Sequence, residues 1–323
     1  MNEPQRLLGV VMDPIEDIKP KKDSTLAMLL AAQRRGWAPV YFRQQDLSIR
    51  DGIAMGHGRH VEVADDPEKW FELGEAWDGR LDALDALLMR KDPPFDMEYI
   101  YTTYILQIAE NGGLLVVNEP ASLREINEKA YTAWFPQCAP PNLITRSRED
   151  LLAFVEEQGK VVFKPLDGMG GRSIFVVERG DINTNVVLET LTDYGKRYIM
   201  AQRYLPEIVD GDKRILLIDG LPVDYALARI PAPGESRGNL VMGARGEGRP
   251  LSDRDRWICE QVGPALRDRG ITFAGLDVIG DYLTEINVTS PTGIREIDSQ
   301  FGLDIAGELI AAIERRIEAR ARK

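Results

Sequence analysis

Lys164 stands at the end of an apolar stretch, VVFK, and is followed closely by a glycine-rich turn at residues 167–171. Adjacent glycines let backbone N–H groups approach a phosphate, and a lysine in an apolar strand needs a partner for its charge. The β-branched and aromatic residues after the turn predict a second strand, whereas a helix follows a Walker P-loop. We interpret the segment as a phosphate-binding hairpin; a plain hairpin turn is the alternative.

Asp277, Glu285 and Asn287 form a second candidate group. Glu285 and Asn287 are two residues apart, so their side chains share one face of a strand. Carboxylate and amide oxygens are the hard ligands that Mg²⁺ prefers, and substrate phosphates often complete its shell. Asp277 joins that face only if it pairs with Glu285, which a strict two-residue turn would prevent. We therefore predict a three-residue or bulged connection; a solvated polar face is the alternative.

Four arginines could bind phosphate or carboxylate groups. Arg214 and Arg229 lie in or beside apolar strand segments, and Arg237 and Arg245 lie in a long glycine-rich stretch. Taken singly, each is more typical of an exposed surface. As a set beside a metal–phosphate site, they would serve as clamps for a phosphoryl group and a carboxylate.

The two histidines, His57 and His60, lie in a glycine-rich polar stretch and are expected in a loop, away from catalysis. No nucleophile elbow or Ser/His/Asp arrangement is visible. Lysines, arginines and hard oxygen ligands instead favour phosphoryl transfer by positioning and electrostatics, which needs no covalent enzyme intermediate.

The elements that position these residues begin with a strand–helix alternation. Short apolar runs at residues 7–12, 40–43, 86–89 and 114–117 predict buried strands, and helical spacing is found at residues 24–35 and 96–110. Ser24 is expected to cap the first helix. This βαβα order predicts a doubly wound parallel sheet and an α/β fold.

The rest of the chain changes character. Strands are expected at residues 142–145, on both sides of the glycine turn and at 199–205, with a helix opened by Ser147. Antiparallel hairpins follow, one around Asp219-Gly220 and one over residues 273–288. Helices are expected at residues 252–269 and 303–320. The stretch 231–250 is long for a simple connection, and such loops are often active-site lids.

Composition limits the classes of function. The chain has 323 residues, a net charge of −12 and 28% charged residues, which is typical of an acidic globular enzyme with two or three subdomains. This charge argues against nonspecific binding of nucleic acid, which needs a basic face to neutralise phosphates. Cys138 and Cys259 lack metal-ligand spacing and are expected to be buried thiols. No apolar run predicts a signal peptide or a membrane span, so the cytoplasm is the expected location.

Several longer strings in the sequence resemble bacterial glutathione synthetases of the ATP-grasp superfamily. They are KKDSTLAMLLAAQRRG, LLMRKDPPFD, KPLDGMGG, DGDKRILLIDG, GESRGNL and LTEINVTSPTGIREI, and the resemblance runs from about residue 7 to about residue 315. It implies an ATP-grasp fold preceded by an N-terminal parallel-sheet domain. It also implies an ATP- and Mg²⁺-dependent ligase that joins γ-glutamylcysteine to glycine, and a homotetramer. Two Mg²⁺ ions are expected, and Mn²⁺ is expected to substitute.

The resemblance assigns roles to particular residues. Lys129 and Lys164 would contact ATP phosphates, covered by the loop of Gly168, Met169, Gly170 and Gly171. The adenine hinge would comprise Gln202, Arg203, Tyr204 and Leu205. Asp277, Glu285 and Asn287 match the magnesium ligands. Arg214 matches an arginine that steadies the acyl phosphate, and Arg229 a second arginine near the phosphates.

Substrate residues follow from the same resemblance. Asp23, Ser24, Arg90 and Asp92 lie where the dipeptide is expected, and Ser290 and Thr292 lie near the site. The loop of Arg237 and Arg245 resembles a mobile lid. Family members can carry a cysteine where Gly293 stands, so a thiol there is not required in this chain.

The resemblance divides the chain into three expected parts: residues 1–124 as a substrate-binding α/β domain, 125–205 as a central lid subdomain and 206–323 as a catalytic subdomain. Two other functions compete with this interpretation. One is an ATP-grasp ligase that joins different amino acids or adds glutamates to a protein tail. The other is a nucleotide-binding scaffold that kept the fold and lost catalysis.

Overall fold

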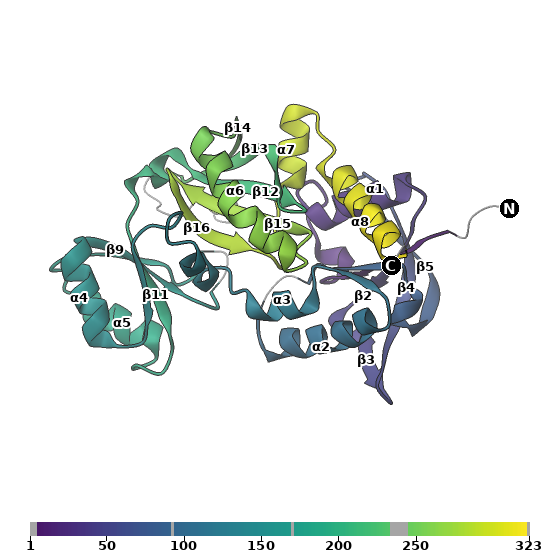
Figure 1. Cartoon of the computed structure of the whole chain (residues 1–323), viewed down its shortest axis with the longest axis horizontal. Helices are drawn as coiled ribbons and strands as arrows, with labels where there is room; N and C mark the ends of the chain where they lie inside the picture. Colours follow the sequence, from purple (N-terminus) through teal and green to yellow (C-terminus); the bar gives the residue numbers. More distant parts are fainter. Residues whose placement is uncertain (1–4, 92–93, 169–170, 233–244, 322–323) are drawn as a thin grey trace.

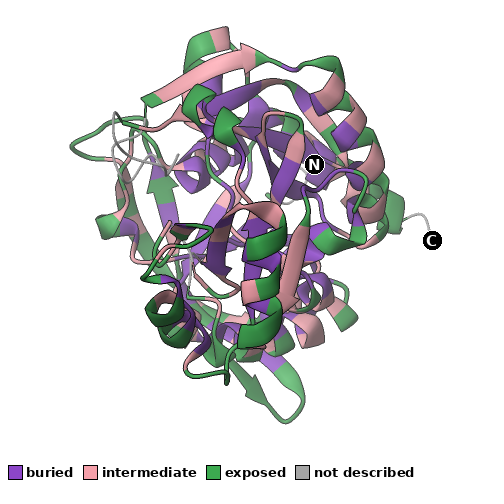
Figure 2. Cartoon of the chain, turned by 90° about the vertical axis from the view of Figure 1, so that its left-hand side faces the viewer, coloured by how far each residue is buried: buried purple, intermediate pink, exposed green. Residues whose placement is uncertain are grey.

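The computed structural model describes residues 5–91, 94–168, 171–232 and 245–321, and within these ranges the strands form three sheets, each accompanied by helices (Figure 1). The first sheet lies on the right of the view, the third in the upper centre, and the second forms a lobe on the left with its own two helices. Buried residues follow the sheets, whereas exposed residues gather on the outer sides of the helices (Figure 2).

The first sheet has seven strands, and its centre is parallel as predicted. The parallel strands run in the order β2 (Ala38–Phe42), β1 (Leu7–Val11), β6 (Ala86–Met89) and β7 (Leu115–Val117). Alternate residues of β1 face opposite cores. Leu8 and Val10 pack with helices α1 (Ser24–Arg34) and α8 (Ile305–Ala321), and Val11 packs with α2 (Met97–Asn111) and α3 (Pro120–Glu125). Helices therefore cover both faces, which confirms the doubly wound arrangement.

Three antiparallel strands extend this sheet: β3 (Leu47–Arg50), β4 (Ile53–Val63) and β5 (Phe71–Arg80). The prediction that His57 and His60 lie in a loop was wrong, because both are in β4. The glycines of β4 conceal its alternation in the sequence, yet one of them has a structural reason. A Cβ added to Gly58 would lie 2.5 Å from the ring of Phe42, so only glycine leaves room for that ring.

The cap of α1 also differs from the prediction. Asp23 precedes the helix, and its carboxylate accepts a hydrogen bond from the backbone N–H of Leu26 at 2.7 Å. Ser24 is the first helical residue instead. Asp and Ser are nearly equal as caps, so the sequence alone does not decide between neighbours.

The second sheet has the order β10 (Phe175–Glu178), β9 (Lys160–Pro165), β11 (Ile199–Arg203) and β8 (Asn142–Thr145), all antiparallel. Helices α4 (Arg148–Gln158) and α5 (Thr184–Thr192) cover one face, where Val161 and Phe163 are buried. Ser147 caps α4 as predicted, accepting from the N–H of Asp150 at 3.3 Å. Since side chains alternate along a strand, Val162 and Lys164 lie on the opposite face.

The third sheet has the order β14 (Arg245–Pro250), β13 (Leu221–Ile230), β12 (Asp212–Ile218), β15 (Phe273–Ile279) and β16 (Tyr282–Asn287). The β12–β13 turn is the predicted one, and both Asp219 and Gly220 have positive φ. Helix α6 (Asp253–Asp268) packs on one face against residues such as Leu276 and Ile286. Arg245 was expected in a loop but begins β14, a strand whose glycines and charges gave no strand signal.

Short segments join these layers. Helix α7 (Ile294–Phe301) follows the third sheet and leads into α8. In the part of the chain that the structure describes, 3-10 helices lie at Ile15–Asp17, Gln44–Asp46, Leu81–Ala83, Ala130–Trp134 and Pro206–Asp210. Across the described residues, no helix is both long and apolar enough to cross a membrane.

Helix α6 passes close to the β12–β13 turn at Gly263, and this contact gives a testable prediction. A Cβ on Gly263 would lie 2.0 Å from the carbonyl oxygen of Gly220, which is backbone and cannot swing away. Helix propensity alone would favour Gly263→Ala by about 1 kcal/mol, but overpacking costs about 1–3 kcal/mol or more. We expect a net loss of about 2 kcal/mol of unfolding free energy by urea denaturation.

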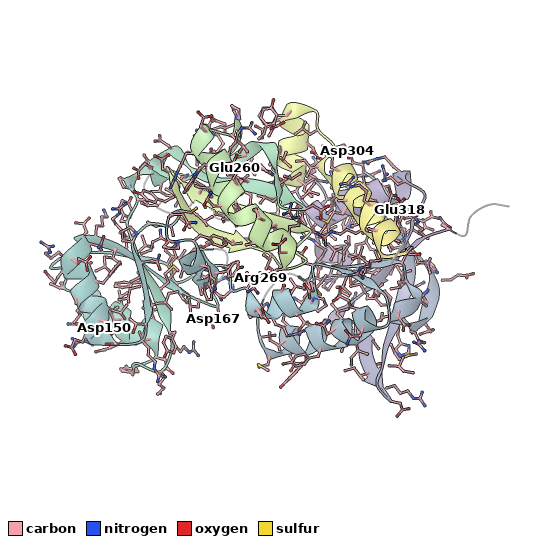
Figure 3. The ribbon with its side chains drawn as sticks, viewed as in Figure 1. Asp150, Asp167, Glu260, Arg269, Asp304 and Glu318 are labelled. Atoms are coloured by element: carbon pink, nitrogen blue, oxygen red, sulfur yellow. The ribbon has the colours of Figure 1, made fainter. Side chains whose placement is uncertain are left out.

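The matched control is Glu260→Ala, an exposed position on the same helix (Figure 3). It should change the unfolding free energy by less than about 0.5 kcal/mol. Equal or greater stability of the Gly263→Ala variant would contradict the close packing of α6 on the β12–β13 turn.

Candidate active site

A row of charged side chains crosses the face of the third sheet opposite α6. Asp212 on β12 pairs with Arg229 on β13, and Arg214 on β12 pairs with Asp277 on β15. Asp277 in turn pairs with Glu285 on β16. Directly paired residues of antiparallel strands point to the same face. Four adjacent strands thus bring these groups together from positions up to 73 residues apart in the sequence, Asp212 and Glu285.

The pairing of Asp277 with Glu285 confirms the predicted irregularity. The turn holds two residues, Gly280 and Asp281, and the register then shifts by one, so that Val278 pairs with Leu283 and Asp277 with Glu285. Thr284 is the extra residue of this bulge, and its hydroxyl donates to the carbonyl oxygen of Asp277 at 3.1 Å. The bulge returns both carboxylates to one face of the sheet.

Asp277 is the centre of the row. Its carboxylate accepts from the Nε of Arg214, from the Nη2 of Arg214 at 2.8 Å and from the amide of Asn287 at 3.3 Å, and the Nη2 of Arg229 lies 2.8 Å from its Oδ2. Burial alone would raise the pKa of Asp277, but the two guanidinium groups outweigh it and hold the pKa below its usual range. A Cβ on Gly275 would lie 2.7 Å from the Cδ of Arg214, so glycine leaves the space that this arginine crosses.

Lys164 of the second sheet faces the same charges. Its side chain is buried, and its Nζ donates to the Oε1 of Gln202 on β11 at 3.2 Å. Burial lowers the pKa of Lys164, while the carboxylates of Glu285, Asp212 and Asp277 oppose that shift. The glycine turn that follows Lys164 contacts Lys129, whose Nζ lies 3.8 Å from Glu285, so the polar faces of the second and third sheets meet in one region.

Lys129 bridges the two sheets. It lies just before the 3-10 helix Ala130–Trp134, and its buried Nζ donates to Glu128 and, at 2.6 Å, to the carbonyl oxygen of Gly168. The Oε1 of Glu285 lies 3.8 Å from the same nitrogen. Burial would lower the pKa of Lys129, but Glu285 and Glu128 outweigh it and the net pKa is raised. The same burial raises the pKa of Glu128 to about 7.

The residues expected at the adenine base lie together at the end of β11. Gln202 and Leu205 are buried. The guanidinium of Arg203 lies 5.2 Å from the ring centroid of Tyr282 on β16, and Lys160 lies 4.4 Å from that of Tyr204. This segment thus runs from the second sheet towards the edge of the third.

The residues expected at the dipeptide meet at the junction of the first and third sheets. Ser24 accepts from the N–H of Ile294 at 3.3 Å, and the hydroxyl of Ser290 donates to the carbonyl oxygen of Arg90 at 3.3 Å. Arg90 donates to the carbonyl oxygen of Pro291 at 3.0 Å. Asp23 caps α1 beside them, and its pKa is raised by burial. Thr292 is exposed in the same segment.

Some expected residues are not placed in this group. Four of them, Asp92, Met169, Gly170 and Arg237, lie outside the described residues. Gly171, the last glycine of the turn, is described and has a φ of 76°. Arg245 pairs with Ile230, so its side chain lies on the other face of the sheet from Arg229. It is largely exposed and pairs with Glu247 at 2.9 Å. The structure brings together Arg214 and Arg229, but not Arg245.

Two partly buried acids were missed by sequence reasoning. Asp212 forms an ion pair with Arg229, and burial raises the pKa of Asp212 to about 6. Glu128 is the partner of Lys129. Asp212 gave a weak signal, because it is a charge at the start of an apolar strand; Glu128 gave none, because its role depends on tertiary contacts.

The oxygen ligands fit a divalent cation in part. Glu285 has a side chain that is 20% exposed, and Asn287 lies two residues further along β16 on the same face. Among the described residues, no group of three or more His, Cys, Asp or Glu side chains converges as a complete metal site. Such a set suits a hard cation that takes further oxygens from a phosphate substrate.

Comparisons with known proteins agree with this geometry. Residues 7–124 match the family described as "Prokaryotic glutathione synthetase, N-terminal domain", and residues 128–302 match "Prokaryotic glutathione synthetase, ATP-grasp domain". Proteins named glutathione synthetase are similar over nearly their whole length. The one from Pseudomonas syringae pv. tomato is 61% identical over 97% of this chain and 98% of its own. For Coxiella burnetii the values are 57%, 95% and 96%.

Solved structures share the fold at low sequence identity. D-cycloserine synthetase has a TM-score of 0.68 at 13% identity, covering 96% of this chain and 99% of its own. The ATP-grasp ligase PsnB, solved with a minimal precursor, Mg and ADP, has a TM-score of 0.62 at 18% identity over 96% and 98%. These neighbours support the fold alone. With the family matches and full-length relatives, they lead to one conclusion: this chain is a member of the prokaryotic glutathione synthetase family and has the ATP-grasp fold.

Proposed function

We propose that this protein ligates γ-glutamylcysteine to glycine with ATP, through an acyl phosphate, to give glutathione, ADP and phosphate. The observation that carries the proposal is the juxtaposition of Lys129 and Lys164 with Asp277 and Glu285 across two sheets, in a chain with full-length similarity to glutathione synthetases. Cations for phosphates on one side and oxygen ligands for a cation on the other are the elements that phosphoryl transfer requires.

A nucleotide would lie between the second and third sheets. Lys129 and Lys164 would contact its phosphates, with Gly168, Met169, Gly170 and Gly171 above them. The lowered pKa of Lys164 means that its charged form is disfavoured by burial, so an anionic phosphate would stabilise it. Gln202, Arg203, Tyr204 and Leu205 would contact the adenine.

The family uses ATP with a divalent metal. Asp277, Glu285 and Asn287 would hold Mg²⁺ here, as two ions, and Mn²⁺ would substitute. Bound there, the metal would offset negative charge on the transferring phosphoryl group. Since both oxygens of Asp277 already accept from arginines, Glu285 is the member of this set best placed to accept a cation.

The chain's own cations position the reacting groups. The cysteinyl carboxylate of γ-glutamylcysteine attacks the γ-phosphorus, ADP leaves and an acyl phosphate forms. Lys164 and two arginines would face this developing charge. Asp277 holds Arg214 in place, and Asp212 holds Arg229. The glycine amine then attacks the acyl carbon, loses a proton and displaces phosphate, which forms the amide bond.

The substrate-binding residues proposed are Asp23, Ser24, Arg90, Asp92, Arg237, Ser290 and Thr292; Arg245 is left out because its side chain lies on the other face of the third sheet. Four of them, Asp23, Ser24, Arg90 and Ser290, already lie around one junction beside the third sheet. We also propose a division into residues 1–124, 125–205 and 206–323, a homotetramer and a cytoplasmic location.

The first test measures ADP release with γ-glutamylcysteine, with and without glycine. Without the amine, the acyl phosphate has no acceptor and turnover should fall close to background, whereas added glycine should restore it and yield glutathione. ADP release that does not depend on glycine would favour a different ligase. No nucleotide turnover with any combination of substrates would favour a scaffold.

A second test removes the proposed metal ligand. Glu285→Ala should lower kcat on the order of 100-fold or more at ordinary Mg²⁺, because a ligand carboxylate is lost. Glu285→Gln keeps the shape and one oxygen, and should recover in part at high Mg²⁺. An unchanged kcat for the alanine variant would refute the metal assignment.

A further inference from the structure

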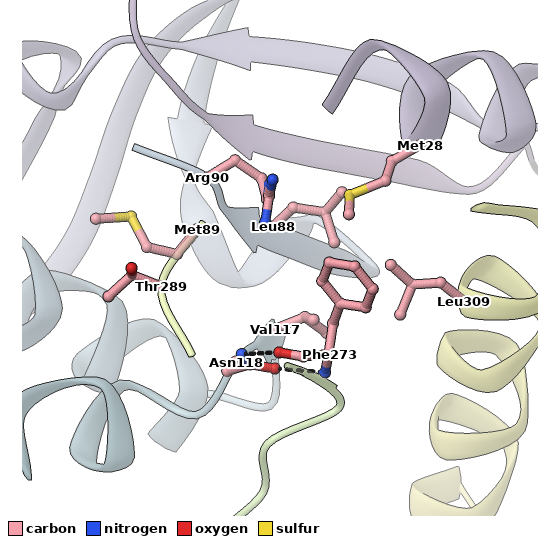
Figure 4. Close-up of a pocket in the computed structure, with 9 residues that line it drawn as sticks. All are labelled: Met28, Leu88, Met89, Arg90, Val117, Asn118, Phe273, Thr289 and Leu309. Carbon is pink, nitrogen blue, oxygen red and sulfur yellow. Dashed lines mark hydrogen bonds between the residues drawn. The ribbon is translucent and has the colours of Figure 1, made fainter. Parts of the chain in front are cut away.

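The side chain of Asn118 joins the first sheet to the third. Asn118 follows β7 and is buried, with 4% of its surface exposed. Its amide nitrogen donates to the carbonyl oxygens of Phe273 at 2.7 Å and Val288 at 2.6 Å. Its oxygen accepts from the N–H groups of Thr272 at 2.8 Å and Phe273 at 2.9 Å. Figure 4 shows this amide pointing at the backbone of Phe273.

These four bonds use the full capacity of the side chain. An amide has two N–H donors and an oxygen with two lone pairs, and each is engaged here. All four partners are backbone groups, so no alternative rotamer of a partner side chain could replace the arrangement. Buried backbone groups left without partners would each cost about 1–3 kcal/mol.

The bonds lie where the ladder between β15 and β16 ends. The last pair before this point is Gly275 with Asn287. Beyond it, the amide of Asn118 spans the carbonyl oxygens of Phe273 and Val288, one from each side of the hairpin. A side chain from the first sheet thus takes the place of a further backbone rung.

Asn118 lies among buried apolar side chains. Val288 and Phe273 each belong to a hydrophobic core, and a small pocket beside Asn118 is lined by Arg90, Phe273 and Thr289, among others (Figure 4). In such surroundings a polar backbone group without a partner is costly, so the four hydrogen bonds favour one position of this segment.

Neighbouring contacts hold the same segment from the same domain. Arg90 donates to the carbonyl oxygen of Pro291, and Ser24 accepts from the N–H of Ile294. The segment 288–294 is thus tied to the first sheet at its beginning, middle and end. Asn287 precedes it directly, and Asp277 lies four residues after Phe273 on β15.

We propose that Asn118 is a positioning residue that sets the end of β16, and with it Asn287, for binding of a metal-bound nucleotide. The inference rests on the proposed function, because Asn287 matters only if a cation and phosphate bind at this face. It goes beyond that function by placing one determinant of the metal site in the domain that carries the dipeptide-binding residues.

The test compares Asn118→Asp with Ser122→Ala. The aspartate is nearly isosteric, but when ionised it has no donor and directs oxygen at two carbonyl groups. Ser122 is the matched control, because it is also buried and also bonds to the backbone just before β15. Its hydroxyl donates to the carbonyl oxygen of Arg269 at 2.6 Å, between α6 and β15. Its hydrogen bonds go to Arg269 and Glu119, not to Phe273 or Val288. Asn118→Ser carries the same test if the aspartate variant does not fold.

The measurement is ADP binding by calorimetry across a Mg²⁺ titration, with melting temperature and kcat recorded for each variant. Asn118→Asp should raise the Mg²⁺ concentration for half-maximal ADP binding roughly tenfold or more, as replacing groups that orient metal ligands does. Ser122→Ala should change it by less than about twofold, although its loss of one buried hydrogen bond lowers the melting temperature.

The proposal would be overturned if both Asn118 variants keep the wild-type Mg²⁺ dependence while only their stability falls, because Asn118 would then be purely structural. ADP binding needs neither γ-glutamylcysteine nor glycine. A wild-type protein that binds Mg·ADP but does not ligate would overturn the proposed function. The effect of the Asn118 variants on the Mg²⁺ dependence of ADP binding could still be measured in that case.

Discussion

The buried ion network around Asp277 is the constraint on which the rest of the structure depends. Two guanidinium groups and a carboxylate lie inside the protein, where each charge alone would be strongly destabilised. They are tolerated because Asp277 pairs with both Arg214 and Arg229, and Asp212 pairs with Arg229, on adjacent strands that place the partners in register. The sheet must therefore keep this register, since a slip of one residue would turn the side chains of a strand to the other face.

This constraint explains why the second and third sheets each have one apolar face and carry charged groups on the other. The third sheet packs its apolar face on α6, and the second packs its apolar face on α4 and α5. The second sheet thus has a core of its own, whereas the third sheet shares its cores with the first. On the face opposite α6, the third sheet carries charge around Asp277 and apolar residues such as Leu216 and Phe273 where it meets the first sheet. Lys129, bonded to the glycine turn and close to Glu285, connects those polar faces. The proposed polyphosphate site therefore needs both amphipathic sheets and cannot be supplied by a single loop.

Local pattern predicted the parts of the molecule whose residues carry their own signal. Apolar runs predicted the parallel strands, and the spacing of Asp277, Glu285 and Asn287 predicted a bulge before the register was known. Strands β4, β5 and β14 were not predicted, because glycine and charged residues hide their alternation. Asp212, Glu128 and Asn118 act through tertiary contacts. The spacing of residues within a short stretch of sequence does not indicate such contacts. The sheet register and domain contacts had to be seen.

The return of α8 to the first sheet has a consequence for how the chain is made. Leu309, Ile310 and Ile313 of this last helix share a core with Leu8 and Val10 of the first strand. During synthesis, β1 leaves the ribosome long before α8, the helix that covers one of its faces. That face lacks its cover until residues 305–321 have been made, so the first sheet reaches its final packing only after α8 is available.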